Sequence, residues 1–120
     1  MAGVNVNLNV DAVAIIREIK EAAKSTTDRQ AFVRDTLNRM KLKYPGSNIM
    51  VFNLGQDYSQ HFKNVKFYDS FDCGGCRFGV WVFEYGTFIN KSEGGWDNWG
   101  FSGKFDRSGD YGRDVKFHKK

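Results

Sequence analysis

Apolar and polar residues alternate strictly over residues 4–10. A period of two is typical of a β-strand, because successive side chains of a strand point to opposite faces. The polar positions in this segment are all asparagine, which is a poor strand former. We therefore expect residues 4–10 to form an edge strand or an extended arm.

The apolar spacing then changes to that of two amphipathic helices. Asp11 is the expected cap of the first helix. Thr27 followed by Gln30 is a capping-box pattern, which predicts the start of the second helix, and Pro45-Gly46 predicts its end. The apolar positions at helical spacing are Ala12, Ile16, Ile19 and Ala23 in the first helix and Val33, Leu37, Met40 and Tyr44 in the second.

From residue 47 onward the pattern predicts short strands separated by turns. Residues 49–54 are almost all apolar, and residues 78–85 are apolar on both faces. Both segments are typical of strands in the interior of a sheet. Tyr85-Gly86 lies between two apolar runs and predicts a two-residue hairpin turn.

Together these elements predict one α+β domain over residues 1–120. A chain of 120 residues has the size of a single domain. Residues 1–45 are mainly helical and residues 46–120 mainly β, and the two parts are expected to share one core. The predicted architecture is an N-terminal strand and two amphipathic helices packed on an antiparallel sheet of about five or six strands, either open or curled toward a barrel.

Composition and charge narrow the classes of function. No apolar run approaches the roughly 20 residues that span a bilayer, so no transmembrane segment is expected. The formal net charge of +4 favours anionic surfaces weakly, and the acidic residues of the β part disfavour a nucleic-acid partner. The first residues lack the basic and apolar segments of a signal peptide, which predicts a cytoplasmic chain or a secreted one from which the signal has been removed. The pattern specifies no oligomeric state.

The sharpest local motif is Cys73-Gly74-Gly75-Cys76. A Cys-x-x-Cys at the start of a helix indicates redox chemistry, because the helix dipole stabilises a thiolate. Here the motif lies between two strand patterns, so a tight hairpin turn is predicted, with Cys73 and Cys76 as candidates for a local disulfide. A zinc site would also need His61 and His118, which lack ligand spacing, so no metal is expected.

Catalytic chemistry has few candidates in this chain. There are only two histidines, and no nucleophile motif surrounds a serine or a cysteine. Glu84 or Asp97 would be the acid of a small glycan-hydrolysing enzyme. The carboxylates are scattered along the chain, however, and this favours a protein that is not an enzyme.

Trp96 is predicted to be an exposed contact residue. Trp99, Phe101 and Phe105 share a strand face and are typical of a core, whereas Trp96 has the opposite parity. An exposed tryptophan among hydrogen-bonding groups is typical of sites that hold sugars or protein partners. The alternative is that Trp96 folds over the edge of the sheet. The candidate ligand-binding residues beside Trp96 are Asn90, Lys91, Asp97 and Asn98.

Many residues, in order along nearly the whole chain, also match one known family. The segments that carry the match are Val4-Asn5-Val6-Asn7-Leu8-Asn9-Val10, Asn48-Ile49-Met50-Val51-Phe52-Asn53-Leu54, Gly79-Val80-Trp81-Val82-Phe83-Glu84, Gly86-Thr87-Phe88, Gly94-Gly95-Trp96, Asn98-Trp99, Phe105-Asp106-Arg107 and Val115-Lys116-Phe117-His118. With these residues the chain resembles the YvgO-like family of small secreted stress-response proteins, whose bacterial members include antifungal proteins. The resemblance supplies no catalytic residues, and the cysteine motif is not part of it.

The sequence and the resemblance together predict a small secreted stress-response or defence protein with antifungal or antimicrobial action. Its expected partner is a component of a fungal or microbial cell surface, which it binds without catalysis. No cofactor is expected. The alternatives are a small glycan-hydrolysing enzyme and an intracellular protein-binding module.

Overall fold

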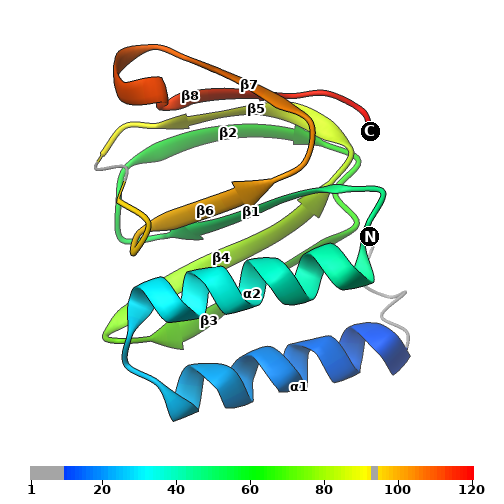
Figure 1. Ribbon diagram of the computed structural model, residues 1–120, viewed down its shortest axis with the longest axis vertical. Coiled ribbons are helices and arrows are strands. Elements are labelled where there is room, and N and C mark those ends of the chain that lie inside the picture. The colour runs from blue at the N-terminus through cyan, green and yellow to red at the C-terminus, as the bar shows by residue number, and fades with distance from the viewer. Residues whose placement is uncertain (1–9, 93–94) are drawn as a thin grey trace.

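The computed structural model describes residues 10–92 and 95–120 and arranges them in three layers (Figure 1). The helices α1 (Val10–Ser25) and α2 (Arg29–Lys43) form one layer. The central sheet has the order β3 (Phe67–Cys73), β4 (Cys76–Phe83), β1 (Asn48–Asn53), β6 (Trp99–Ser102). The outer sheet has the order β2 (Tyr58–Lys63), β5 (Tyr85–Asn90), β8 (Asp114–Phe117), β7 (Phe105–Ser108), with a short 3-10 helix (Asp110–Gly112) before β8. All strand pairs are antiparallel.

The first helix begins earlier than the sequence pattern predicts. Val10, the last member of the alternating segment, is the first residue of α1, so the expected strand is wrong there and Asp11 lies inside the helix. Residues 4–9 lie outside the described residues. The buried side of α1 contains Ile15, Ile19 and Ala23, which pack on the central sheet. The helical spacing therefore predicted the helix and most of its buried face.

The second helix is capped by Asp28 rather than by Thr27. The Asp28 carboxylate accepts a hydrogen bond from the backbone N–H of Ala31, and the Thr26 hydroxyl accepts one from the N–H of Asp28. Aspartate is as good an N-cap as threonine or better, so the helix begins one residue later than the capping-box pattern predicts. Neither described helix is long and apolar enough to cross a membrane.

The central sheet is buried on both faces, as its apolar sequence predicts. Along β1, Ile49 and Val51 pack toward the helices, whereas Met50 and Phe52 pack toward the outer sheet. Strand β4 alternates in the same way and lies beside β1 in the middle of the sheet. Period-two alternation disappears from such strands because both faces need apolar residues. The prediction of two interior strands is confirmed.

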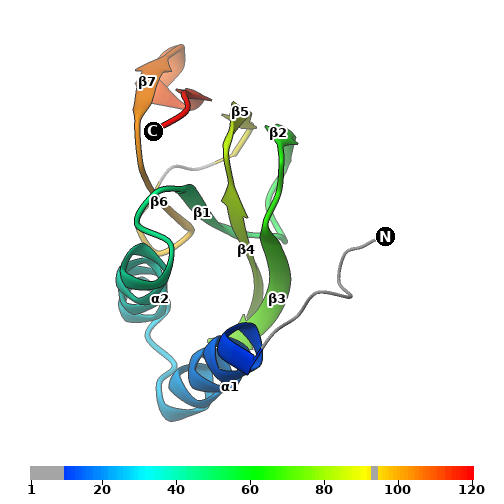
Figure 2. The same cartoon turned by 90° about the vertical axis from the view of Figure 1, so that its right-hand side faces the viewer.

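The chain does not form the single sheet of five or six strands that the sequence predicted. Within residues 10–92 and 95–120 the strands form two four-stranded sheets, because the chain passes from one sheet to the other. Strand β4 continues into β5 through Glu84, and β2 continues into β3 beside it (Figure 2). Strands that change sheets in this way form the corners of a sandwich. The described strands do not close into a barrel.

Gly86 shows why the predicted hairpin at Tyr85-Gly86 is wrong. Both residues belong to β5, which pairs with β2 and β8 and not with β4. Gly86 has φ +136°, and a Cβ there would lie 2.2 Å from the carbonyl oxygen of His61. The glycine therefore serves a close approach of two strands, and not a turn.

Asn48 joins the segments that meet at one corner of the two sheets. Its side-chain amide donates to the carbonyl oxygens of Glu84 and His118, at 2.7 and 2.9 Å, and its oxygen accepts from the N–H of Lys104 at 2.8 Å. Asn48 is fully buried. These three partners lie at the β4–β5 crossing, at the end of β8 and at the β6–β7 crossing. One side chain thus connects three segments of the chain.

Candidate binding surface and neighbouring thiols

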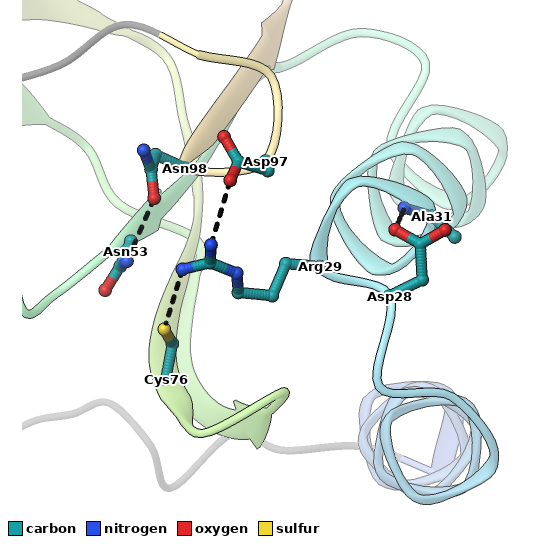
Figure 3. Close-up of polar contacts among 7 residues, drawn as sticks. All are labelled: Asp28, Arg29, Ala31, Asn53, Cys76, Asp97 and Asn98. Atoms are coloured by element: carbon teal, nitrogen blue, oxygen red, sulfur yellow. Dashed lines mark hydrogen bonds and ion pairs between the residues drawn. The ribbon is translucent and has the colours of Figure 1, made fainter.

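The loop that contains Trp96 is held in place by two buried asparagines, Asn53 at the end of β1 and Asn98 just before β6. The amide of Asn53 donates to the side-chain oxygen of Asn98 at 3.1 Å, and the two backbones are joined by a hydrogen bond of 2.7 Å. The N–H of Asn98 also donates to the carbonyl of Gly95. Figure 3 shows the two asparagines facing each other beside Asp97. Residues 95–98 are therefore fixed to the central sheet.

Trp96 projects from this loop and is 52% exposed. Its ring lies 6.1 Å from that of Phe101, and the guanidinium of Arg107 lies 6.0 Å from the Trp96 ring and 5.2 Å from the Phe101 ring. The Nε of Arg107 donates to the carbonyl of Gly112, which holds the guanidinium in position. Trp96, Phe101 and Arg107 form what we call the Trp96 surface. It offers an aromatic face and a fixed cation to a ligand.

Trp99, three residues later, has the opposite environment. It is fully buried and contacts Phe52, Phe88 and Phe101 between the two sheets. The prediction that Trp96 and Trp99 differ in exposure is confirmed.

Phe105, which the same pattern assigned to the core, is 37% exposed because it lies on β7, an edge strand of the outer sheet. That assignment was wrong because Phe105 does not share a strand with Trp99 and Phe101: β6 and β7 are separate strands in different sheets.

Arg29 connects the loop to the cysteine hairpin (Figure 3). One guanidinium nitrogen donates to the Asp97 carboxylate at 3.0 Å, and the other donates to Sγ of Cys76 at 3.1 Å. The hydrogen bond to Cys76 and the charge interaction with the same sulfur raise the pKa of Arg29, and Asp97 adds to this. The guanidinium therefore stays protonated. It links the first turn of α2 to two segments that are distant in the chain.

Cys73 and Cys76 flank a two-residue turn between β3 and β4, as predicted. Gly74 and Gly75 both have positive φ, +59° and +79°, which is the requirement of a type I′ hairpin turn. A Cβ on Gly74 would lie 2.7 Å from the carbonyl oxygen of Thr27, so the turn packs closely on the connection between the helices. The structure holds both cysteines as thiols. Their disulfide stays a prediction.

The candidate binding residues do not all lie on the surface. Asn90 is buried, and its side-chain oxygen accepts from the N–H of Ser92. Asn98 is buried as well, and Asp97 is partly exposed and paired with Arg29. Lys91 is exposed. Asn90 and Asn98 therefore hold the backbone on either side of the loop, while Trp96, Lys91 and Asp97 are accessible to a ligand.

The sequence reasoning missed the roles of Arg29 and Arg107. Arg107 lies eleven residues after Trp96, on strand β7 of the outer sheet, and Arg29 lies 68 residues before Asp97. Arg29 belongs to no motif, and Arg107 occurs in the family match without an assigned role. Finding them would have required a prediction of how the helices and strands pack together.

The candidate catalytic and zinc-binding residues are separated. Glu84 lies beside Asn48, and Asp97 lies beside the Asn53–Asn98 pair, so the two carboxylates lie near opposite ends of β1. A strand of six residues spans about 17 Å. The cysteine motif lies on the central sheet, whereas His61 lies on β2 and His118 pairs with Asp106 at 2.7 Å. In residues 10–92 and 95–120, no three His, Cys, Asp or Glu side chains gather as metal ligands do.

The fold and the loop define a small α+β protein with two stacked antiparallel sheets, one helical layer and an exposed aromatic–cation surface. The chain is 44% identical to the stress response protein YvgO of Bacillus subtilis (strain 168), over 98% of this chain and 72% of that protein. The chain therefore belongs to the YvgO-like family of stress-response proteins. Comparison with protein-family models gives no match, and comparison with solved structures also gives none.

Proposed function

We propose that this stress-response protein is a secreted defence protein, antifungal or antimicrobial, that binds a component of a microbial cell surface. The observation that carries the proposal is the exposure of Trp96 on a loop fixed by buried hydrogen bonds. Exposing a tryptophan costs the free energy that its burial would contribute. The Trp96 side chain is half exposed to solvent although a packed core lies beside it. This exposure supports a role in contact with a ligand.

The chemistry of the Trp96 surface favours a polysaccharide ligand. A flat indole face packs against the C–H face of a sugar ring, and flanking polar groups bind the hydroxyls. Arg107 adds a fixed cation beside the indole, and the net charge of +4 favours anionic surfaces. The secreted location is part of the proposal, and what supports it is the resemblance to a family of secreted proteins. Detection of the protein in the culture medium of its stressed source organism, and not in the cell fraction, tests that part of the proposal.

Replacing Trp96 with alanine is expected to weaken binding to fungal cell walls at least tenfold and to leave the melting temperature within a few degrees of wild type. The side chain is half exposed, so its removal opens little cavity. The measurements are a cell-wall pull-down, a fungal growth assay and a thermal melt. Tyr68→Ala is the matched control, because Tyr68 is an exposed aromatic on β3, at the opposite edge of the central sheet. Unchanged binding and growth inhibition by Trp96→Ala would remove the Trp96 surface from the proposal.

Glycan hydrolysis is not expected. The paired carboxylates of glycosidases lie roughly 5–10 Å apart, whereas Glu84 and Asp97 lie near opposite ends of β1. Glu84 also accepts a hydrogen bond from the side chain of Asn64 at the sheet crossing, which is a structural contact. Incubation with chitin, glucan and peptidoglycan is expected to release no soluble sugar. Release that disappears in Glu84→Gln or Asp97→Asn would contradict this prediction.

A further inference from the structure

The two cysteines of the β3–β4 hairpin are placed so that their sulfurs can join. Cys73 and Cys76 are direct partners across the antiparallel pair, so their side chains lie on the same face of the sheet. Paired residues of antiparallel strands have Cα atoms about 4.5–5.5 Å apart, within the range that a disulfide spans. The hairpin therefore needs no large backbone movement to close a bridge.

The surroundings of the two thiols differ. Cys76 is partly exposed, and its sulfur receives a hydrogen bond from the protonated guanidinium of Arg29 at 3.1 Å. Cys73 is almost fully buried, and its thiol donates to the carbonyl oxygen of Thr26 at 3.5 Å. Burial raises the pKa of Cys73, and the negative charges of Asp28 and Cys76 add to the effect. A thiolate is the reactive form of cysteine. Of the two cysteines, Cys76 is the one that combines partial exposure with a neighbouring cation.

We propose that Cys73 and Cys76 are a peroxide-reactive pair, in which Cys76 is oxidised first and Cys73 then closes a disulfide. In the first step the Cys76 thiolate attacks one oxygen of a hydroperoxide. An S–O bond forms, the O–O bond breaks, and the leaving oxygen takes a proton and departs as water or an alcohol. The sulfur is oxidised to a sulfenic acid and the peroxide is reduced.

The second step joins the two sulfurs. The sulfur of Cys73 attacks the sulfenic sulfur of Cys76, the S–S bond forms and the S–O bond breaks. The hydroxide leaves together with the proton of the Cys73 thiol, so this step releases one molecule of water. The sulfur that is oxidised is the one that accepts the hydrogen bond from Arg29. The ion pair between Arg29 and Asp97 has no part in the chemistry. The proposal is independent of what the Trp96 surface binds.

Mass spectrometry of the full-length protein after brief treatment with hydrogen peroxide tests the order of events. Wild type is expected to lose two hydrogen atoms and to regain them with a reductant. In Cys73→Ala the reaction stops at the first step, so dimedone, which traps sulfenic acids, is expected to label Cys76. In Cys76→Ala no label is expected on Cys73 over the same time. Circular dichroism confirms that both variants are folded.

Removal of the guanidinium tests the role of Arg29. Arg29→Gln in the Cys73→Ala background is expected to slow dimedone labelling of Cys76 roughly tenfold, the effect of losing one charge-assisted hydrogen bond to the reacting sulfur. Arg77→Gln is the matched control. It removes the same charge next to Cys76 in the chain, but Arg77 points to the opposite face of β4 and pairs with Asp72. Its labelling rate is expected to equal that of the parent.

Three results would overturn the proposal. The first is labelling of Cys73 in Cys76→Ala as fast as that of Cys76 in Cys73→Ala, which would remove the assigned order. The second is a wild-type protein whose mass does not fall by two hydrogen atoms after peroxide treatment, or that forms disulfides only between chains. The third is an equal loss of labelling rate in Arg29→Gln and Arg77→Gln. The rate would then depend on the loss of one positive charge near Cys76, and not on the hydrogen bond from Arg29.

Discussion

Trp99→Ala is expected to lower the free energy of unfolding by about 3–5 kcal/mol, among the largest losses available to a single truncation in this protein. Trp99 is fully buried between the two sheets, where its ring contacts Phe52, Phe88 and Phe101 at centroid distances of 4.8–6.3 Å. Truncation leaves a cavity that rigid neighbouring strands cannot fill. The melting temperature is expected to fall by roughly 10 °C or more.

Urea unfolding followed by circular dichroism measures this loss. Trp96→Ala is the control, because it removes the same side chain three residues earlier at an exposed position. Trp99→Ala is expected to lower the free energy of unfolding, whereas Trp96→Ala is expected to weaken binding and leave stability almost unchanged. A Trp99→Ala variant that loses less than about 1 kcal/mol would contradict the buried position of this ring between the sheets.

The second large effect is expected at Asn48, where Asn48→Asp should cost at least about 3 kcal/mol at neutral pH. The asparagine amide donates to two carbonyl oxygens, and its oxygen accepts from the N–H of Lys104. A carboxylate has no N–H to donate, so it would face the oxygens of Glu84 and His118 as an uncompensated buried charge. The isosteric change tests the hydrogen bonds without a change in packing volume.

The cost of Asn48→Asp is expected to depend on pH. Burial beside carbonyl oxygens raises the pKa of such a carboxyl, because the neutral form is favoured there and can donate one hydrogen bond. The charge penalty is therefore absent below the unfolded pKa of about 3.9, grows as the pH rises, and levels off above the folded pKa. Asn38→Asp, the same change at an exposed position of α2, is the control. A penalty that is equal at pH 4 and pH 7 would contradict this account.

Local patterns predicted the features that depend on neighbouring residues. The helical spacing of α2 predicted the burial of Val33 and Met40, and the apolar segments of β1 and β4 predicted strands covered on both faces. Gly74-Gly75 predicted a tight turn because positive φ costs glycine little. The different exposure of Trp96 and Trp99 was predicted from strand parity, but Trp96 lies in the turn before β6, so its exposure comes from the loop and not from strand alternation.

Patterns failed where the chain passes from one sheet to the other. Apolar residues before and after Tyr85-Gly86 predicted two strands joined by a hairpin, but the chain bends at Glu84 and continues through both residues into the second sheet. A bend and a turn have similar sequence signals, because both use glycine and polar residues. The number of sheets follows from which strands pair. Strand pairing depends on contacts between residues that are far apart in the sequence.

The sequence by itself therefore determined the two helices, the interior strands and the cysteine turn. The tertiary structure decided the two-sheet architecture, the corner at Asn48 and the placement of Arg107 over the rings of Trp96 and Phe101. It also decided that Arg29 reaches both Asp97 and Cys76, across 68 and 47 positions of the chain. The physical reason is range: backbone propensity and side-chain periodicity act within a few residues, whereas these contacts exist only after the helices and sheets have packed together.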